Sequence, residues 1–206
     1  MRKFLTTIKK PELVARRRSQ IMAAAMNLFR KQGYHATTMR QICEESQVNR
    51  GSFYDYFRSK EDILVYIYKE MMYEAGDFDR TFPELKISGW KDLEPFVRYI
   101  ARNSWERNRS AIQLLYRETI SLDRKTMREV LRVESGYIKW VAENLRRGLK
   151  LPKINKKLEI LANTIVYLNA FLPLRGWNMH HLDPDEVLDS VVELVMMKLE
   201  ELRPQP

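Results

Sequence analysis

The sequence predicts an all-α fold, with a small N-terminal head of three helices and a larger C-terminal helical body. Apolar residues recur at helical spacing through most of the chain after residue 11, and no segment alternates apolar and polar residues as strands do. Helix-boundary signals divide the chain further, for example Gly33 and the pair Asp183 and Pro184. These observations together favour helices packed on helices and exclude a sheet protein.

Composition agrees with a globular protein. The chain has 206 residues, of which 45% are hydrophobic and 31% are charged, enough for a sizeable core. Its longest apolar stretch, residues 160–174, is interrupted by Asn163 and Pro173 and is too short to span a membrane. The N-terminus lacks the apolar core of a signal peptide, so we expect a cytoplasmic protein. The single cysteine, Cys43, excludes an internal disulfide and favours a small core residue.

Positive charge is concentrated at one end of the chain. Residues 1–60 hold 13 Lys or Arg against 4 Asp or Glu, so the whole net charge of +9 lies there. This distribution is typical of a protein that binds a polyanion such as DNA. The alternative is a basic face that only keeps the protein in solution.

Two very short helices are predicted within this basic segment, at residues 38–46 and 50–57. Thr37 or Thr38 can cap the first helix, and Asn49 can cap the second. Phe53 and Phe57 form the buried face of the second helix, which leaves its polar residues on the outer face. Two such helices joined by a turn form a helix-turn-helix, whose second helix lies in the major groove of DNA.

The same stretch resembles the N-terminal signature of the TetR family of bacterial transcriptional regulators, over roughly residues 15–72. The residues that carry the resemblance are Gly33, Tyr34, Thr37, Thr38, Ile42, Val48, Gly51, Tyr54, Tyr56, Phe57 and Lys60. Gln47 departs from the pattern, because the family has Gly at this turn, and it predicts slight strain. Cys43 and Ser46 replace alanines, and Asp55 places an acid in the reading helix.

Motif and resemblance together predict which residues contact DNA, with Lys60 as a phosphate contact implied by the resemblance. The predicted DNA-binding residues are Thr37, Thr38, Arg40, Asn49, Arg50, Gly51, Ser52, Tyr54, Tyr56 and Lys60. Arg16, Arg17 and Arg18, in a first helix predicted at residues 12–32, are further candidates for phosphate contacts or a solvated face. Residues 1–11 form a basic arm that Pro11 separates from that helix, or a disordered tail.

The rest of the chain is predicted to be helical at about residues 60–75, 92–107, 109–120, 124–148, 155–179 and 184–203. We expect three parts: a flexible arm at 1–11, a DNA-binding domain at 12–58, and a regulatory and dimerisation domain at 59–206. The last two helices are apolar on two faces, so one face can pack within the subunit and the other against a second copy. The resemblance implies the same homodimer, which would place two heads on two half-sites.

The resemblance also implies a pocket for a small effector in the body. The predicted ligand-binding residues are Phe96, Tyr99, Arg102, Asn103, Trp105, Tyr116, Glu118, Trp140, Asn163, Tyr167 and Phe171. Each aromatic among them is also explained by ordinary core packing. The aromatic and methionine content favours an apolar or flat ligand.

The predicted function is a dimeric, ligand-responsive DNA-binding transcriptional regulator, a repressor released from its operator by the effector. One alternative is a non-specific, architectural DNA-binding protein. An enzyme is not expected, because the sequence has no Gly-rich phosphate loop and no nucleophile beside a plausible base. No cofactor or metal site is expected either, since the adjacent His180 and His181 cannot face one metal from a helix.

Overall fold

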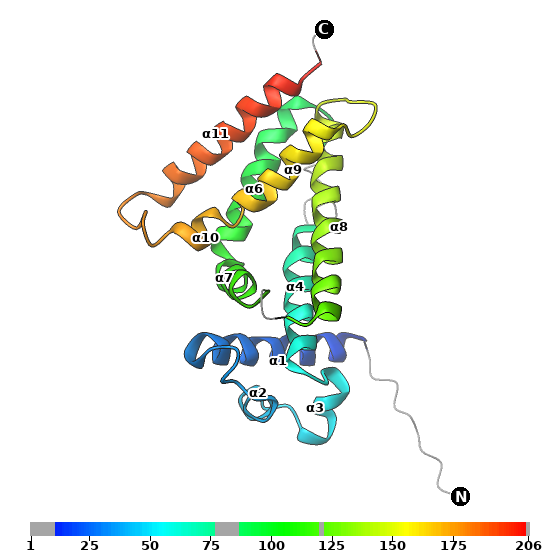
Figure 1. Ribbon diagram of the computed structural model, residues 1–206, viewed down its shortest axis with the longest axis vertical. Coiled ribbons are helices and arrows are strands. Elements are labelled where there is room, and N and C mark those ends of the chain that lie inside the picture. The colour runs from blue at the N-terminus through cyan, green and yellow to red at the C-terminus, as the bar shows by residue number, and fades with distance from the viewer. Residues whose placement is uncertain (1–10, 77–86, 120–121, 205–206) are drawn as a thin grey trace, which may run out of the picture. The chain divides into compact units, whose positions relative to one another are not determined.

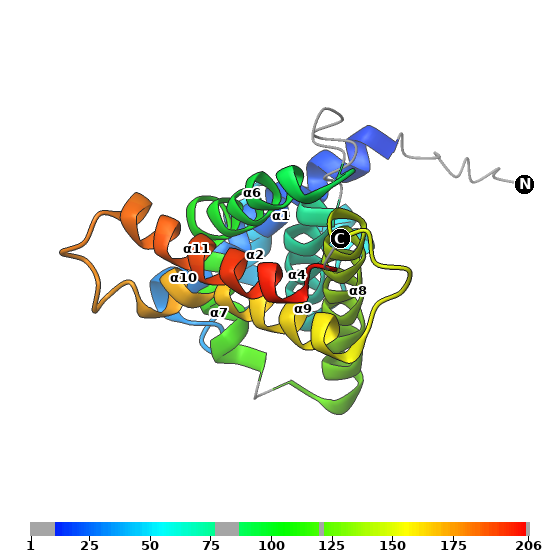
Figure 2. The ribbon, with the colours of Figure 1, turned by 90° about the horizontal axis from the view of Figure 1, so that it is seen from above.

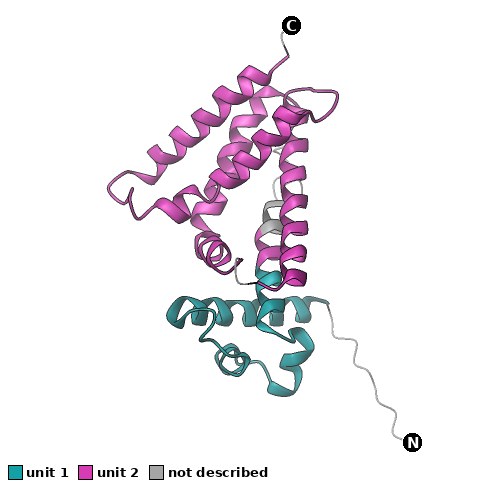
Figure 3. Ribbon diagram, in the orientation of Figure 1, with its two compact units in different colours: residues 1–67 teal, residues 68–206 magenta. Residues whose placement is uncertain are grey.

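The computed structural model describes residues 11–76, 87–119 and 122–204, and every helix or strand element in these ranges is a helix. Figure 1 labels the elements along the chain. The chain divides into two compact units, Met1–Ile67 and Tyr68–Pro206, which Figure 3 shows in different colours. The all-α prediction is confirmed, and none of the described helices is long and apolar enough to cross a membrane.

From residue 11, where the described part of the chain begins, the first unit consists of three helices and the start of a fourth. These are α1 (Pro11–Gln32), α2 (Met39–Ser46), α3 (Arg50–Tyr56) and the first part of α4 (Lys60–Gly76). Each helix contributes fully buried side chains to one small core: Ile21, Phe29, Ile42, Phe53, Ile63 and Leu64. A helix as short as α2 or α3 is not stable alone, so this shared core holds both in place.

Two helix boundaries in this unit follow from backbone chemistry. Pro11 is the first residue of α1 and does not break the chain before it. The backbone N–H of the first helical residue has no partner within the helix, so proline, which has no N–H, loses nothing there. Gly33 follows α1 with a φ of +86°, the left-handed conformation that glycine adopts at low cost. The predicted arm at 1–10 lies outside the described residues.

In its described residues, the second unit contains the end of α4 and seven further elements. They are η1 (Trp90–Asp92), α6 (Leu93–Glu106), α7 (Arg109–Glu118), α8 (Arg124–Gly148), α9 (Lys156–Leu168), α10 (Phe171–Arg175) and α11 (Pro184–Leu202). Helix α8 packs on α9, and α11 packs on α6 and α9, as Figure 2 shows from above. Their buried faces form one large core that includes Phe96, Ile100, Val141, Leu145, Ile165 and Val191.

The predicted single helix at 155–179 is wrong, because the structure has α9 and α10 separated at Asn169 and Ala170. Pro173 explains the break, since its ring clashes with the carbonyl one turn earlier and it has no N–H to donate there. The helix at 184–203 is confirmed as α11, with Asp183 as the cap and Pro184 at the first position.

Candidate nucleic-acid interface and effector cavity

A reciprocal pair of hydrogen bonds begins α2. The Gln41 backbone N–H donates to Oγ1 of Thr38 at 3.2 Å, and the Thr38 N–H donates to Oε1 of Gln41 at 2.8 Å. This is a capping box, which satisfies two backbone donors that the helix leaves unpaired. Of the two predicted caps, Thr38 therefore caps α2.

The turn between α2 and α3 is tight and partly strained. Gln47 has φ 54° and ψ 20°, the left-handed conformation that a non-glycine residue rarely adopts. Within the turn, the Ser46 hydroxyl donates to the Cys43 carbonyl at 3.0 Å. At the start of α3, Oδ1 of Asn49 accepts from the Gly51 N–H at 2.8 Å, so Asn49 is the predicted cap. A Cβ at position 51 would lie only 3.1 Å from that Oδ1, which favours glycine there.

Helix α3 buries one face and exposes the other. Phe53 is fully buried, and Val48 and Phe57 are buried beside it. Arg50 is exposed on the opposite face, and Tyr54 is 47% exposed. A surface hollow lies along both short helices and is lined by Arg40, Cys43, Glu44, Gln47, Val48, Asn49, Arg50 and Tyr54. The second helix thus presents arginine, amide and phenol groups that can bond to base edges or phosphates.

Two of the predicted DNA-binding residues have other tasks in the structure. Thr37 is fully buried, and its hydroxyl donates to the Gly33 carbonyl at 2.7 Å, so it supports the turn after α1. The ammonium of Lys60 donates to the Tyr34 carbonyl at 2.9 Å and lies 4.7 Å from the Tyr34 ring centroid. Lys60 is half-buried and secures the same turn from α4.

The arginines of α1 also differ from one another. The Arg18 guanidinium lies 6.0 Å from the Phe57 ring centroid and 5.5 Å from that of Tyr66, so it packs within the head. Arg17 donates to Gln20 at 2.8 Å, and Arg16 is exposed. Arg16 is therefore the best placed of the three to meet a phosphate.

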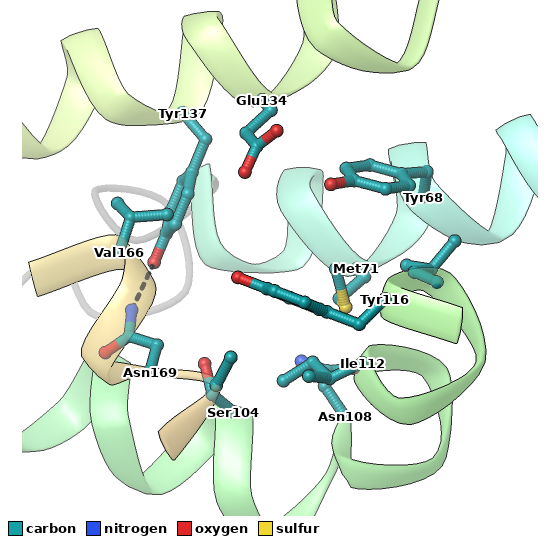
Figure 4. A pocket seen from close by; sticks show the side chains of 12 residues that line it. Tyr68, Met71, Ser104, Asn108, Ile112, Tyr116, Glu134, Tyr137, Val166 and Asn169 are labelled. Atoms are coloured by element: carbon teal, nitrogen blue, oxygen red, sulfur yellow. Dashed lines mark hydrogen bonds between the residues drawn. The ribbon is translucent and has the colours of Figure 1, made fainter. Parts of the chain in front are cut away.

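A cavity opens within the second unit, with about 480 Å³ of empty space that includes the part open to solvent. Figure 4 shows its lining. The lining residues come from five helices and the α9–α10 break: Tyr68, Met71, Ser104, Asn108, Ile112, Leu115, Tyr116, Glu134, Tyr137, Val166, Asn169 and Ala170. A mostly apolar wall with a few polar groups is typical of small-molecule sites.

Polar groups in the cavity hold one another in place. Nδ2 of Asn169 donates to the Tyr137 hydroxyl at 3.4 Å, which Figure 4 marks as a dashed line. Burial raises the pKa of Tyr137 and that of Tyr68, and it raises the pKa of Tyr116 to about 12, so all three phenols stay protonated donors at neutral pH. Burial also raises the pKa of the Glu134 carboxyl, although a hydrogen bond with Tyr68 acts against that rise.

The predicted ligand-binding residues lie mostly elsewhere, and Tyr116 is the member of that set that lines the cavity. Phe96 and Trp105 are buried, and Phe96 packs in the main core against the Trp140 ring at 5.4 Å. Arg102 forms ion pairs at the surface with Asp185 and Glu106. The other members are Tyr99, half-buried against the core; Asn103 and Glu118, buried; Asn163 and Tyr167, exposed; and Phe171, half-buried.

The sequence prediction missed Tyr68 and Glu134 as possible ligand contacts, whereas Asn169 is among the polar residues that it offers as anchors for an effector. In the sequence, Tyr68 belongs to the apolar stripe of α4, and Glu134 is one of many charged residues on the long helix α8. The helix break at Asn169 has a signal in the sequence, because Pro173, four residues later, cannot accept the helical bonding pattern. That break turns Asn169 and Ala170 towards the cavity.

An apolar strip on α9 and α11 remains exposed. Ile160 is 67% exposed, Tyr167 62%, Leu194 61% and Met197 62%. We call these four residues the α9–α11 strip. They lie on two helices that pack against each other, and large apolar side chains exposed together commonly mark a protein–protein contact.

A tight turn between two short helices, an exposed polar face on the second and a basic N-terminal segment are typical of a helix-turn-helix that binds DNA. Residues 21–67 match the family model described as "Bacterial regulatory proteins, tetR family". This match confirms the resemblance found in the sequence, and curated relatives that are transcriptional regulators agree with it.

Curated relatives share the function named by the family. "HTH-type transcriptional regulator HbdR" of Aromatoleum sp. (strain CIB) is 35% identical over 130 residues, which span 59% of this chain and 54% of that protein. The chain thus matches about half the length of HbdR. "Fatty acid metabolism regulator protein" of Bacillus subtilis (strain 168) is 26% identical over 185 residues, 86% of this chain and 92% of that protein.

Solved structures share the fold. The structure of the transcriptional regulator FadR from Bacillus subtilis in complex with stearoyl-CoA has a TM-score of 0.67 at 20% identity, over 86% of this chain and 97% of that one. The fatty acid degradation regulator FadR from Bacillus halodurans has a TM-score of 0.64 at 20% identity, over 92% of this chain and 97% of that one.

Proposed function

We propose that this protein is a dimeric repressor that binds an operator through α3 and leaves it when a small effector fills the cavity. The observation that carries the proposal is the exposed outer face of α3, with Arg50 and Tyr54 on a helix whose other face is anchored by buried Phe53. The remaining predicted contacts, from Thr38, Arg40, Asn49, Gly51, Ser52, Tyr56 and Lys60, would position the head on the phosphate backbone or add to base reading.

The functional domains in this proposal keep their predicted limits, an arm at 1–11, a DNA-binding domain at 12–58 and a regulatory domain at 59–206. Thr37 leaves the proposed set of DNA contacts, because its buried hydroxyl is already bonded to Gly33. Two heads joined in a dimer would read two half-sites, so the second head binds at a high effective concentration.

Effector response would act through α4. Tyr68 and Met71 of this helix line the cavity, and the same helix begins at Lys60 within the first unit. A ligand that favours one arrangement of α4 would shift the population of heads away from the form that fits the operator. The size of that shift is set by the difference between its affinities for the two forms.

Specific DNA binding can be tested with the purified chain and DNA selected from a random pool, including the region before its own gene. Arg50→Ala and Tyr54→Ala should each weaken specific binding by roughly 1–3 kcal/mol if the side chain contacts a base. Leu131→Ala, an exposed residue of α8, is the matched control and should bind normally. Equal affinity for selected and random DNA at fixed salt would instead favour the architectural alternative.

A further inference from the structure

The cavity has one charged group among its twelve described lining residues, the carboxylate of Glu134 on α8. None of these twelve residues is Lys, Arg or His. Two cations on the helices that line the cavity are already paired. The Lys69 Nζ lies 2.6 Å from Oε1 of Glu129, and the Arg117 Nε lies 2.7 Å from Oε1 of Glu118. Among the described residues that line it, the cavity therefore carries a negative charge without an opposing one.

Three tyrosine rings surround this carboxylate. Figure 4 shows the Glu134 carboxylate and the hydroxyls of Tyr68 and Tyr116 directed towards the same open space, with the Tyr137 ring at its side. The face of an aromatic ring carries a negative quadrupole, which attracts cations. A ligand that lies against the face of one of these rings would therefore meet the same preference for positive charge as it meets at the carboxylate.

Burial works in the same direction. Burial raises the pKa of the Glu134 carboxyl, because it leaves the charged form less well solvated than it is in water. A cation placed beside the carboxylate would replace that lost solvation, whereas an anion would add repulsion. A neutral apolar molecule would fill the space and leave the charge as it is.

We propose that the cavity selects an organic cation, an apolar or aromatic molecule with an ammonium group that lies between Glu134 and the rings of Tyr68 and Tyr116. This inference rests on the proposed effector role of the cavity and names the chemical class of the effector. It differs from what the stearoyl-CoA complex of the Bacillus subtilis regulator would suggest by analogy.

Calorimetric titration with three probes tests the charge preference directly. Benzyltrimethylammonium is the cation, neopentylbenzene is its neutral carbon analogue with the same shape, and stearoyl-CoA is an anionic acyl ligand. We expect the cation to bind about tenfold or more tightly than its neutral analogue, because ring and carboxylate attraction act together in a partly dehydrated site. Tighter binding of neopentylbenzene or stearoyl-CoA, or no binding of the cation, would overturn the proposal.

Two pairs of variants locate the effect. Glu134→Gln should lower cation affinity about tenfold and leave the neutral analogue unchanged, whereas Glu143→Gln, near the C-terminal end of the same helix and outside the lining, should change neither. At the exposed Tyr116, Tyr116→Phe should keep most of the cation affinity and Tyr116→Leu should lose it. Equal cation affinity in Glu134→Gln and the unaltered chain would contradict the assignment.

The titrations need no DNA, so their outcome is independent of the repressor proposal. An electrophoretic shift on the selected DNA decides that separately. If the cation binds through Glu134 but the chain binds no specific DNA, the proposed function fails and the ligand class stands. If specific DNA is bound and the neutral or acyl probe is preferred, the ligand class fails and the repressor proposal stands.

Discussion

Gln47 holds a backbone conformation that costs free energy for any residue with a Cβ, with φ at 54° in the turn of the helix-turn-helix. Gln47→Gly should relieve this strain and stabilise the fold by about 0.5–1 kcal/mol, after the greater flexibility of glycine in the unfolded chain is subtracted. Urea unfolding measures the change. Gln47→Ala is the control, since alanine keeps the Cβ and should give no gain. A glycine variant no more stable than the alanine variant would contradict this account of the turn.

Lys60 allows a structural role to be separated from a phosphate contact. Lys60→Met keeps much of the apolar stem but removes the bonds to the Tyr34 and His35 carbonyls, so it should destabilise the fold by about 1–2 kcal/mol. If Lys60 also contacts a phosphate, the slope of log affinity against log salt should fall by about one. An unchanged slope with lowered stability would leave Lys60 with the structural role alone.

At the scale of elements, the C-terminal end of α8 is held by a charged cluster. Arg146 donates two bonds of 2.8 Å to Glu143 and one of 2.7 Å to the Leu151 carbonyl beyond the helix. The Arg146 bonds lower the pKa of the Glu143 carboxyl from 4.5 to about 2. Because the folded pKa is the lower one, this stabilisation is present above about pH 4.5 and is lost as pH falls towards 2.

Glu143→Gln should therefore make the free energy of unfolding depend less on pH. The free energy lost at neutral pH should be no more than about 1 kcal/mol, because the side chain is 37% exposed and screened by water. Unfolding free energies between pH 2 and 7 measure it. The difference between variant and unaltered chain should vanish near pH 2 and shrink in 1 M salt. A difference that stays constant across this range would rule out the ion pair as its source.

Local signals explain which elements the sequence predicts. Thr38, Asn49 and Asp183 cap helices where a cap is expected, because capping depends on neighbouring backbone groups alone. The break at Asn169 was missed, since apolar periodicity continues through Pro173 and hides it. A pocket was expected, but most of its lining was missed for a different reason. Tyr68 and Glu134 meet only in the packed fold, and nothing in their spacing along the chain brings them together.

For the whole molecule, the exposed α9–α11 strip bears on the oligomeric state. Exposing four large apolar side chains to water is costly at roughly 25 cal/mol per Å², and a second copy related by a two-fold axis would bury the same strip on both subunits. The pair Leu194→Glu and Met197→Glu should therefore produce a monomer in sedimentation experiments, because it would bury four charges in a self-complementary contact. Leu131→Glu, a similar exposed leucine on α8, should leave the oligomeric state unchanged.

The same double variant should also bind its operator DNA less tightly. A monomer reads one half-site and gives up the effective concentration that joins two heads, so operator affinity should fall by about 10²-fold or more. Binding to a single half-site should stay the same, because Arg50, Tyr54 and the buried anchor Phe53 belong to the first unit and are untouched. Joint loss of full-site and half-site binding would indicate a damaged fold. A dimer that persists with both glutamates would place the interface on another face of the second unit.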